Sequence, residues 1–95
     1  MPPLYKTDWR FSMRKFGFTC YLDFDNNSYR DYQLFVRQCR QMFGEQFWRY
    51  GEYSNSSKYC WCTARMQGPH RRTRIYLKDE SQYTMLLLGL DHSNA

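Results

Sequence analysis

A run of alternating side chains over residues 16–24 constrains the fold of this chain more than any other feature of its sequence. The apolar members all share one parity, and they are Phe16, Phe18, Cys20, Leu22 and Phe24. The opposite parity holds Thr19, Tyr21 and Asp23. Successive side chains of a β-strand point to opposite faces, so the run predicts a strand with one buried face. The Asp-Asn-Asn sequence at 25–27 predicts the turn that ends it.

Two segments have the three-and-four spacing of amphipathic helices. The first begins with Ser28 as N-cap and Asp31 three positions on, and Gly44 is placed to end it in a left-handed conformation. Its apolar stripe is Tyr32, Phe35, Val36, Cys39, Met42 and Phe43. The second begins with Asp79 as N-cap and Gln82 at the third position. Its apolar side is Tyr83, Leu86, Leu87 and Leu90.

The other predicted strands are short and lie mostly between the two helices. They cover residues 47–50, 58–66 and 72–77, and a further short edge strand is indicated at 9–13. The main elements therefore follow the order β-α-β-β-β-α, in one domain that spans residues 1–95. Residues 1–8 are expected to form an N-terminal arm, and residues 91–95 a polar tail.

This order predicts an α+β open-faced sandwich, with a mainly antiparallel sheet and both helices on one face. In the strand at 58–66 the small or apolar residues Cys60, Cys62, Ala64 and Met66 suit the helix-covered face. The opposite parity of each strand then lies on the open face. That face is predicted to carry Tyr21, Trp48, Tyr59, Trp61, Arg65, Arg72, Arg74 and Tyr76, with Arg71 at the sheet edge.

The composition fits a nucleic-acid partner for this open face. Aromatic residues make up 20% of the chain, the net charge is +5, and ten of the fourteen basic residues are Arg. Exposed rings stack on unpaired bases, and guanidinium groups bind phosphates. The face therefore predicts non-catalytic binding of single-stranded RNA or DNA. Two alternatives stay open: a module that binds an acidic protein surface, because Tyr, Trp and Arg are common at such interfaces, and aromatic pairs that only stabilise the sheet.

The sequence gives weak support to an enzyme or to a metal site. Asp23 and Asp25 could hold magnesium at a strand end, but this position is more often a solvated one. No Cys-x-x-Cys pair is present, and neither a cofactor nor a metal is expected. Cys60 and Cys62, two apart in a strand, are about 6.6 Å apart, too far for a mutual disulfide; a bridge to Cys20 or Cys39 remains open. We expect reduced thiols that act as apolar fillers.

No secretory signal pattern is visible, and the longest apolar run, residues 85–90, is far too short to span a membrane. A cytoplasmic protein without a membrane partner is therefore expected. The segment 74–88, which reads Arg-Ile-Tyr-Leu-Lys-Asp-Glu-Ser-Gln-Tyr-Thr-Met-Leu-Leu-Leu, resembles the ending of small accessory proteins of tailed bacteriophages. The resemblance implies a virus-encoded regulatory factor in the host cytoplasm, for instance one that binds and inhibits a host protein. The β-α-β-β-β-α order is also similar to open-faced sandwiches such as the RNA-recognition-motif domain, but this chain departs from that family in its exact element order and lacks the family's aromatic-glycine signature.

Overall fold

The structure of the protein is a computed structural model, and it describes residues 3–8, 11–46, 60–66 and 72–93. Four strands form one antiparallel sheet in the order β1-β2-β4-β3. The strands are β1 (Leu4–Lys6), β2 (Cys20–Phe24), β3 (Trp61–Met66) and β4 (Arg72–Leu77). The central strands are thus the first long strand and the C-terminal one.

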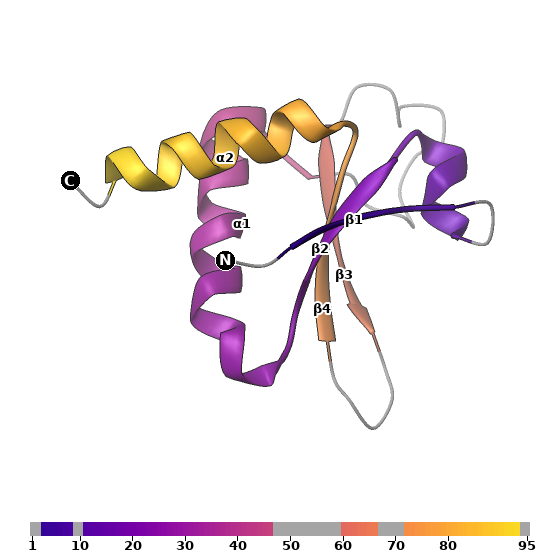
Figure 1. The fold of residues 1–95 in the computed structure, drawn as a ribbon, viewed down its shortest axis with the longest axis horizontal. Helices are drawn as coiled ribbons and strands as arrows, with labels where there is room; N and C mark the ends of the chain where they lie inside the picture. The colour runs from indigo at the N-terminus through magenta and orange to yellow at the C-terminus, as the bar shows by residue number, and fades with distance from the viewer. Residues whose placement is uncertain (1–2, 9–10, 47–59, 67–71, 94–95) are drawn as a thin grey trace.

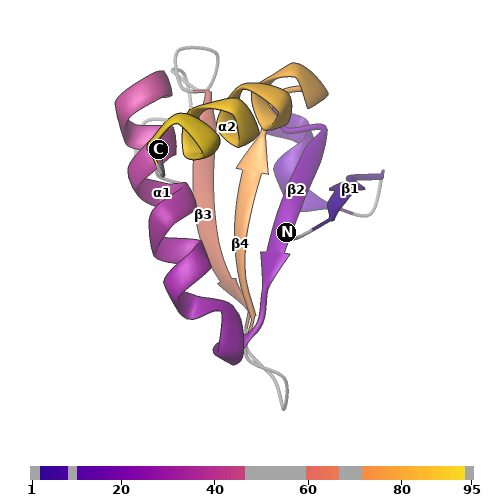
Figure 2. The ribbon, with the colours of Figure 1, turned by 60° about the vertical axis from the view of Figure 1, so that its left-hand side comes forward.

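Two α-helices cover one face of this sheet, as Figures 1 and 2 show. They are α1 (Tyr29–Phe43) and α2 (Glu80–Ser93). Two short 3-10 helices, η1 (Ser12–Phe16) and η2 (Asn26–Ser28), flank β2 in the sequence, and η1 lies on the opposite side of the sheet from α1 and α2 (Figure 1). The predicted α+β fold, with a mainly antiparallel sheet and both helices on one face, is confirmed.

The N-terminal part departs from the predicted element order. The expected arm contains β1, which pairs with β2 through Tyr5 and Tyr21. Residues 12–16 form η1 and not a strand, so the strand predicted from residue 16 begins only at Cys20. Gly17 separates the two elements, because its φ of +92° lies in the left-handed region that glycine adopts at low cost. The strand predicted at 47–50 lies outside the described residues.

The sheet has a buried cluster on each face. The helix-side core consists of Cys20, Leu22, Phe24, Phe35, Cys39, Trp61, Ile75, Leu77 and Leu86. The cluster on the other face consists of Phe16, Phe18, Tyr21, Cys62 and Tyr76, with Phe11 and Ala64 packed against it. The inward parity predicted for β4 and for Cys20, Leu22 and Phe24 of β2 is therefore confirmed. Phe16 and Phe18, predicted to share that face, lie in the opposite cluster, because they precede β2 and belong to the segment that η1 and Gly17 turn over the sheet.

The parity predicted for β3 is wrong. Trp61 is fully buried in the helix-side core, and its indole N–H donates to the carbonyl oxygen of Gly44 at 2.9 Å, just after α1. Cys62 lies on the other face, opposite Tyr76 in the register. The space beneath the end of α1 takes a large ring, whereas a small thiol fits among the rings of the other face. Small size was therefore the wrong criterion for the helix-covered side of this strand.

The two helix starts differ in how they are capped. Asp79 and Gln82 form the predicted reciprocal cap: Asp79 Oδ1 accepts from the Gln82 N–H at 3.2 Å, and Gln82 Oε1 accepts from the Asp79 N–H at 3.3 Å. Ser28 precedes α1, but its side chain makes no capping hydrogen bond. The capping side chain in this region is that of Asp25, which caps η2: its Oδ1 accepts from the Ser28 N–H at 3.0 Å.

Candidate nucleic-acid interface

The sheet face opposite the helices, here called the aromatic face, is built around three tyrosines from neighbouring strands. The register places Tyr5 opposite Tyr21 and Tyr21 opposite Tyr76. The ring centroids of Tyr5 and Tyr21 are 5.4 Å apart in a stacked arrangement, and those of Tyr21 and Tyr76 are 5.7 Å apart. Cross-strand ring pairs of this kind stabilise a sheet and fix ring orientation. The tyrosines therefore form an ordered row across the sheet.

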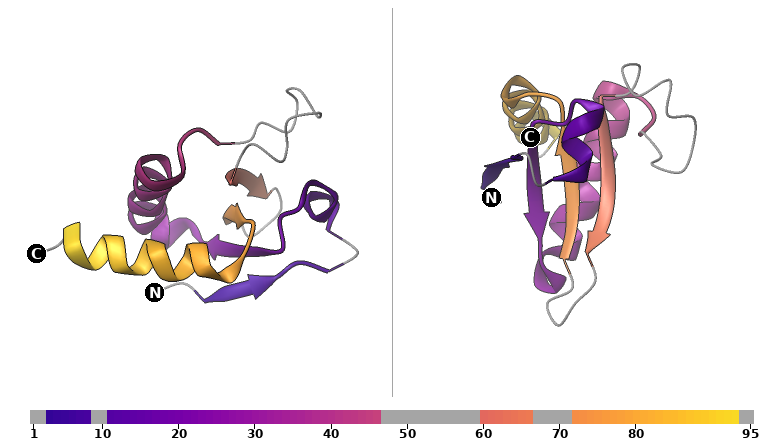
Figure 3. Two further views of the ribbon diagram at one scale, coloured as in Figure 1. Left: turned by 90° about the horizontal axis from the view of Figure 1, so that it is seen from above. Right: turned by 90° about the vertical axis from the view of Figure 1, so that its right-hand side faces the viewer.

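Only one ring of this row is widely exposed. Tyr21 and Tyr76 are buried, at 9% and 4% exposure, whereas Tyr5 is 43% exposed. Phe11 packs on Tyr21 with ring centroids 5.3 Å apart, and Phe18 lies 6.4 Å from Tyr76. The segment 11–18, which contains η1, thus covers these two rings and is called here the lid. Its helix η1 can be seen in front of the sheet in the right panel of Figure 3. The prediction that Tyr21 and Tyr76 offer open stacking surfaces is wrong.

Lys78 fastens this lid to the end of β4. Its ammonium group donates to the carbonyl oxygen of Phe16 and lies 4.3 Å from the centroid of the Phe18 ring. Burial lowers the pKa of Lys78. Thr7 fastens the other side of the lid, because its buried hydroxyl donates to the carbonyl oxygen of Phe18 at 2.8 Å.

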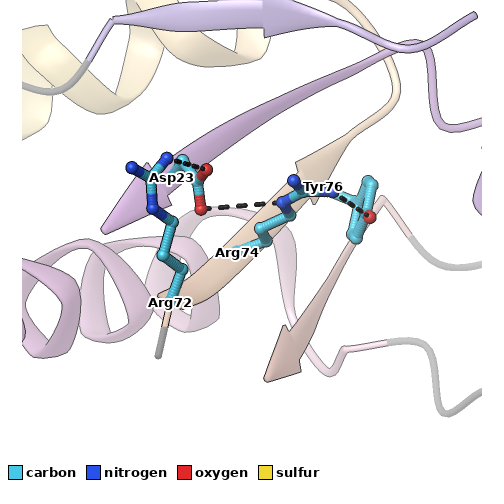
Figure 4. Close-up of polar contacts among 4 residues, drawn as sticks. All are labelled: Asp23, Arg72, Arg74 and Tyr76. Carbon is cyan, nitrogen blue, oxygen red and sulfur yellow. Dashed lines mark hydrogen bonds and ion pairs between the residues drawn. The ribbon is translucent and has the colours of Figure 1, made fainter. Parts of the chain in front are cut away.

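Beside the tyrosine row, one carboxylate holds two arginines (Figure 4). Asp23 Oδ2 lies 3.2 Å from a guanidinium nitrogen of Arg72, and Asp23 Oδ1 lies 3.6 Å from Nε of Arg74. The second distance is that of an ion pair without a hydrogen bond, and both atoms are buried and otherwise unpartnered. One negative and two positive charges leave this group with a net charge of +1.

The two arginines differ in their access to solvent. The Arg74 guanidinium lies 4.5 Å from the centroid of the Tyr21 ring, donates to the Tyr76 hydroxyl at 3.4 Å, and has a side chain only 18% exposed. The Arg72 side chain is 53% exposed. Arg74 is therefore packed within the aromatic face, whereas the guanidinium group of Arg72 is half-exposed and can bind an anion.

Two further cations lie on η1, at the other end of the aromatic face. Arg14 is exposed and donates to the carbonyl oxygen of Thr7 at 3.0 Å. Lys15 is exposed and lies 5.1 Å from the centroid of the Phe16 ring. Arg72 begins β4, while Phe16 and Lys78 meet beyond its far end. Exposed positive charge therefore lies on both sides of the tyrosine row, at the two ends of β4.

Two of the remaining predicted site residues lie away from this face, and three are outside the described residues. Trp61 lies in the core on the other side. Arg65 is exposed, but the register pairs it with Thr73, opposite Phe24, which places it on the helix-side parity. The predicted positions Trp48, Tyr59 and Arg71 lie outside the described residues.

Three residues that the sequence reasoning missed do belong here: Tyr5, Arg14 and Lys15. Residues 4–7 read Leu-Tyr-Lys-Thr and do not alternate between apolar and polar, so the three-residue strand β1 has no pattern in the sequence. The cations on η1 have no signal either, because the sequence predicts strand on both sides of residue 14, where the structure has a 3-10 helix.

The two acids that the sequence suggested as magnesium ligands have structural roles. Asp23 holds Arg72 and Arg74, and Asp25 caps η2. Within the described residues, no group of three or more His, Cys, Asp and Glu side chains is arranged to hold a metal ion. All four cysteines are free thiols. Burial raises the pKa of Cys39 and of Cys62 to about 12, as expected for thiols that serve as apolar filling.

Within the part of the chain that the structure describes, no helix has the length and apolar character needed to cross a membrane. Comparisons of the chain with protein families, with curated proteins and with solved structures found no match. The bacteriophage resemblance of the C-terminal segment therefore stays a prediction, and the site is interpreted from its own geometry.

Proposed function

We propose that the protein binds single-stranded nucleic acid, without catalysis, across the aromatic face. Tyr5 would stack on a base, and Arg72 at one end and Arg14 and Lys15 at the other would contact phosphates. The observation that carries the proposal is the Tyr5 ring, which is 43% exposed and held by its stacked contact with Tyr21. The role that fits this chemistry is that of a small regulatory factor, in the cytoplasm of the host if the chain is virus-encoded.

The stacking step favours an unpaired strand. A base within a duplex already stacks on its neighbours, whereas an unpaired base gains about 1 to 3 kcal/mol from an aromatic ring. Tyr21 fixes the Tyr5 ring before any ligand arrives, so little side-chain freedom is lost on binding. Tyr5 therefore serves as a prepared platform for one base.

The charge distribution favours a polyanion over a single phosphate. The exposed cations lie on opposite sides of the tyrosine row, one group near the start of β4 and the other beyond its end, so one phosphate group cannot meet all of them. A strand that runs along the face can place successive phosphates near Arg72, over the row, and near Arg14. The net charge of +5 adds long-range attraction, which makes the affinity strongly dependent on salt.

The test compares two exposed tyrosines on opposite faces. Tyr5→Ala should weaken binding of a fluorescent single-stranded oligonucleotide by about tenfold, the equivalent of one lost stacking contact. Tyr29→Ala is the matched control, because Tyr29 is 48% exposed on α1, on the far side of the sheet. Fluorescence anisotropy at low and moderate salt measures both variants.

Two results would contradict the proposal. One is an absence of oligonucleotide binding at micromolar protein in low salt. The other is an equal loss of affinity in Tyr5→Ala and Tyr29→Ala. If no oligonucleotide binds and a pull-down recovers one specific protein, the face is a protein-binding module.

A further inference from the structure

The helix α2 is apolar on almost every side, yet it lies on the surface. Its residues from 83 to 90 include Tyr83, Met85, four leucines and Gly89, with Thr84 the single polar side chain. A helix with this pattern is normally buried all round. Leu86 is fully buried against the sheet, but Leu88 is 56% exposed and Met85 is also exposed. The outer side of α2 therefore has apolar surface that the described fold does not cover.

Exposed apolar side chains on α1 lie next to this surface. Leu34, Gln38 and Met42 are spaced by four residues and so share one side of α1. A Cβ atom added to Gly89 would collide with Gln38 Nε2 and lie 3.4 Å from Met42 Sδ, so the Gly89 side of α2 faces this side of α1. Met85 is four residues before Gly89 on the same side. Leu34, Met42, Met85 and Leu88, all exposed, are called here the two-helix patch.

Positive charge borders the two-helix patch. Arg30 and Arg37 are exposed, and they are the i−4 and i+3 neighbours of Leu34 on the surface of α1. Arg40 is also exposed on α1. Asp31, the i−3 neighbour of Leu34, is the one acidic residue of this helix, so three arginines outnumber it. Glu80 of α2 is paired with Lys6 at 3.3 Å. An apolar centre with a basic border fits a partner that is apolar in the middle and acidic around it.

We infer that the two-helix patch binds an acidic amphipathic helix of a partner protein. Such a helix presents apolar residues at positions i, i+3, i+4 and i+7, which can pack between Met42, Met85 and Leu88. Its flanking carboxylates would meet Arg30 and Arg37. A second copy of this chain is a poorer occupant, because it would bring a like-charged border against this one. This surface is separate from the aromatic face, since the sheet lies between them (Figure 2).

The test uses two designed peptides of about 16 residues, long enough to form a helix. Both carry leucine at i, i+3, i+4 and i+7; one has glutamate at the outer positions, the other lysine. Fluorescence anisotropy should show binding of the glutamate peptide that weakens with salt, and at least tenfold weaker binding of the lysine peptide.

Variants assign the binding to the patch. Leu88→Ala should weaken the glutamate peptide about tenfold, as expected for a central apolar contact, whereas the neighbouring Thr84→Ala should change it less than about twofold. Both replacements put a good helix former at an exposed position, so neither should disturb the fold. Arg37→Gln should weaken the glutamate peptide and reduce its salt dependence, while Arg14→Gln on the aromatic face should do neither.

Three results would overturn the inference. The first is a failure of the glutamate peptide to bind at several hundred micromolar. The second is equal binding of both peptides, which would remove the charge argument. The third is sedimentation of the wild-type protein as a dimer that Leu88→Ala converts to a monomer, which would make a second copy the occupant. Oligonucleotide binding by Leu88→Ala should equal that of wild type, so the outcome does not depend on the proposed function.

Discussion

The two faces of the sheet bury their side chains by different means. On the helix side, α1 and α2 cover a cluster made mainly of aliphatic residues and thiols, with Trp61 as its largest member. On the aromatic side, η1 and its flanking residues cover a row of rings beside an ion-paired group of Asp23, Arg72 and Arg74. One face thus has a thick apolar cover, and the other a thin cover that includes charges.

This difference indicates which face of the sheet can bind a ligand. Apolar residues under two helices gain nothing from opening, because water is their only alternative neighbour. The ions and rings of the aromatic face can accept phosphates and bases in place of their present neighbours. A ligand site is therefore compatible with the thinly covered face while the other face provides the stability of the fold.

Among the variants that test this contrast between the two faces, Trp61→Ala should have the largest effect on stability. It removes the biggest helix-side core ring and its hydrogen bond to Gly44, so the free energy of unfolding should fall by about 3 to 5 kcal/mol. Urea unfolding followed by circular dichroism measures the loss. Tyr5→Ala, its counterpart on the aromatic side, should cost less than about 1 kcal/mol. A stable Trp61→Ala protein that no longer binds oligonucleotide would place Trp61 outside the core and reverse the assignment of the two faces.

Asp23→Asn should have a smaller effect on stability and an opposite effect on affinity: the protein becomes less stable but binds oligonucleotide more tightly. Loss of the carboxylate leaves Arg74 partly buried without its counter-ion, which should lower the free energy of unfolding by about 1 to 2 kcal/mol. The same change frees Arg72 and raises the charge of the face by one, so oligonucleotide affinity should rise about three- to tenfold.

The matched control for this change is Asp31→Asn, which removes an exposed carboxylate on α1 and should leave the affinity within about twofold. A fall in affinity in Asp23→Asn, in a protein still folded at the assay temperature, would show that the carboxylate positions the cations and does not compete for them.

Alkaline pH should have the smallest effect: it should lower the free energy of unfolding through one buried thiol on each face of the sheet. Cys39 lies under the helices and Cys62 on the aromatic face, and burial raises the pKa of each thiol from 9.0 to about 12. Between these values the unfolded thiols ionise while the folded ones stay protonated. Stability is therefore complete below pH 9 and lost as the pH rises toward 12, by about 1 kcal/mol per thiol at pH 10.

Urea unfolding under reducing conditions at pH 8 and pH 10 measures this loss. Cys62→Ala should reduce the difference between the two pH values by about 1 kcal/mol, the share of one thiol. An unchanged difference in that variant would mean that the Cys62 thiol is wetter than its place among the rings indicates.

The sequence predicted the elements whose pattern is local. The alternation through β2, the apolar stripes of α1 and α2, and the cap formed by Asp79 and Gln82 all describe one element at a time. Each was confirmed except for the start of β2 and for Met42, which the α1 stripe predicts as buried and which is exposed. In β3 both parities carry apolar residues, so only the neighbours across the sheet decide the direction of Trp61. Those neighbours are not visible in a local pattern.

The candidate site was predictable in its position but not in its exposure. The parity of β2 and β4 correctly put Tyr21, Arg72, Arg74 and Tyr76 on the face opposite the helices. The burial of Tyr21 and Tyr76 depends on η1, which Gly17 turns back over the sheet and Lys78 fastens there. This contact joins residues 62 positions apart in the chain, and no local periodicity reports it.

The side chain of Gln82 joins three segments that should unfold together. Its side-chain oxygen accepts from the backbone N–H groups of Lys78 and Asp79, and its side-chain nitrogen donates to the carbonyl oxygen of Cys60, next to β3. One buried amide therefore ties the end of β4, the start of α2 and the edge strand together. In native-state hydrogen exchange these three segments should become accessible together, as one cooperative unit, while β1 and the lid can open earlier.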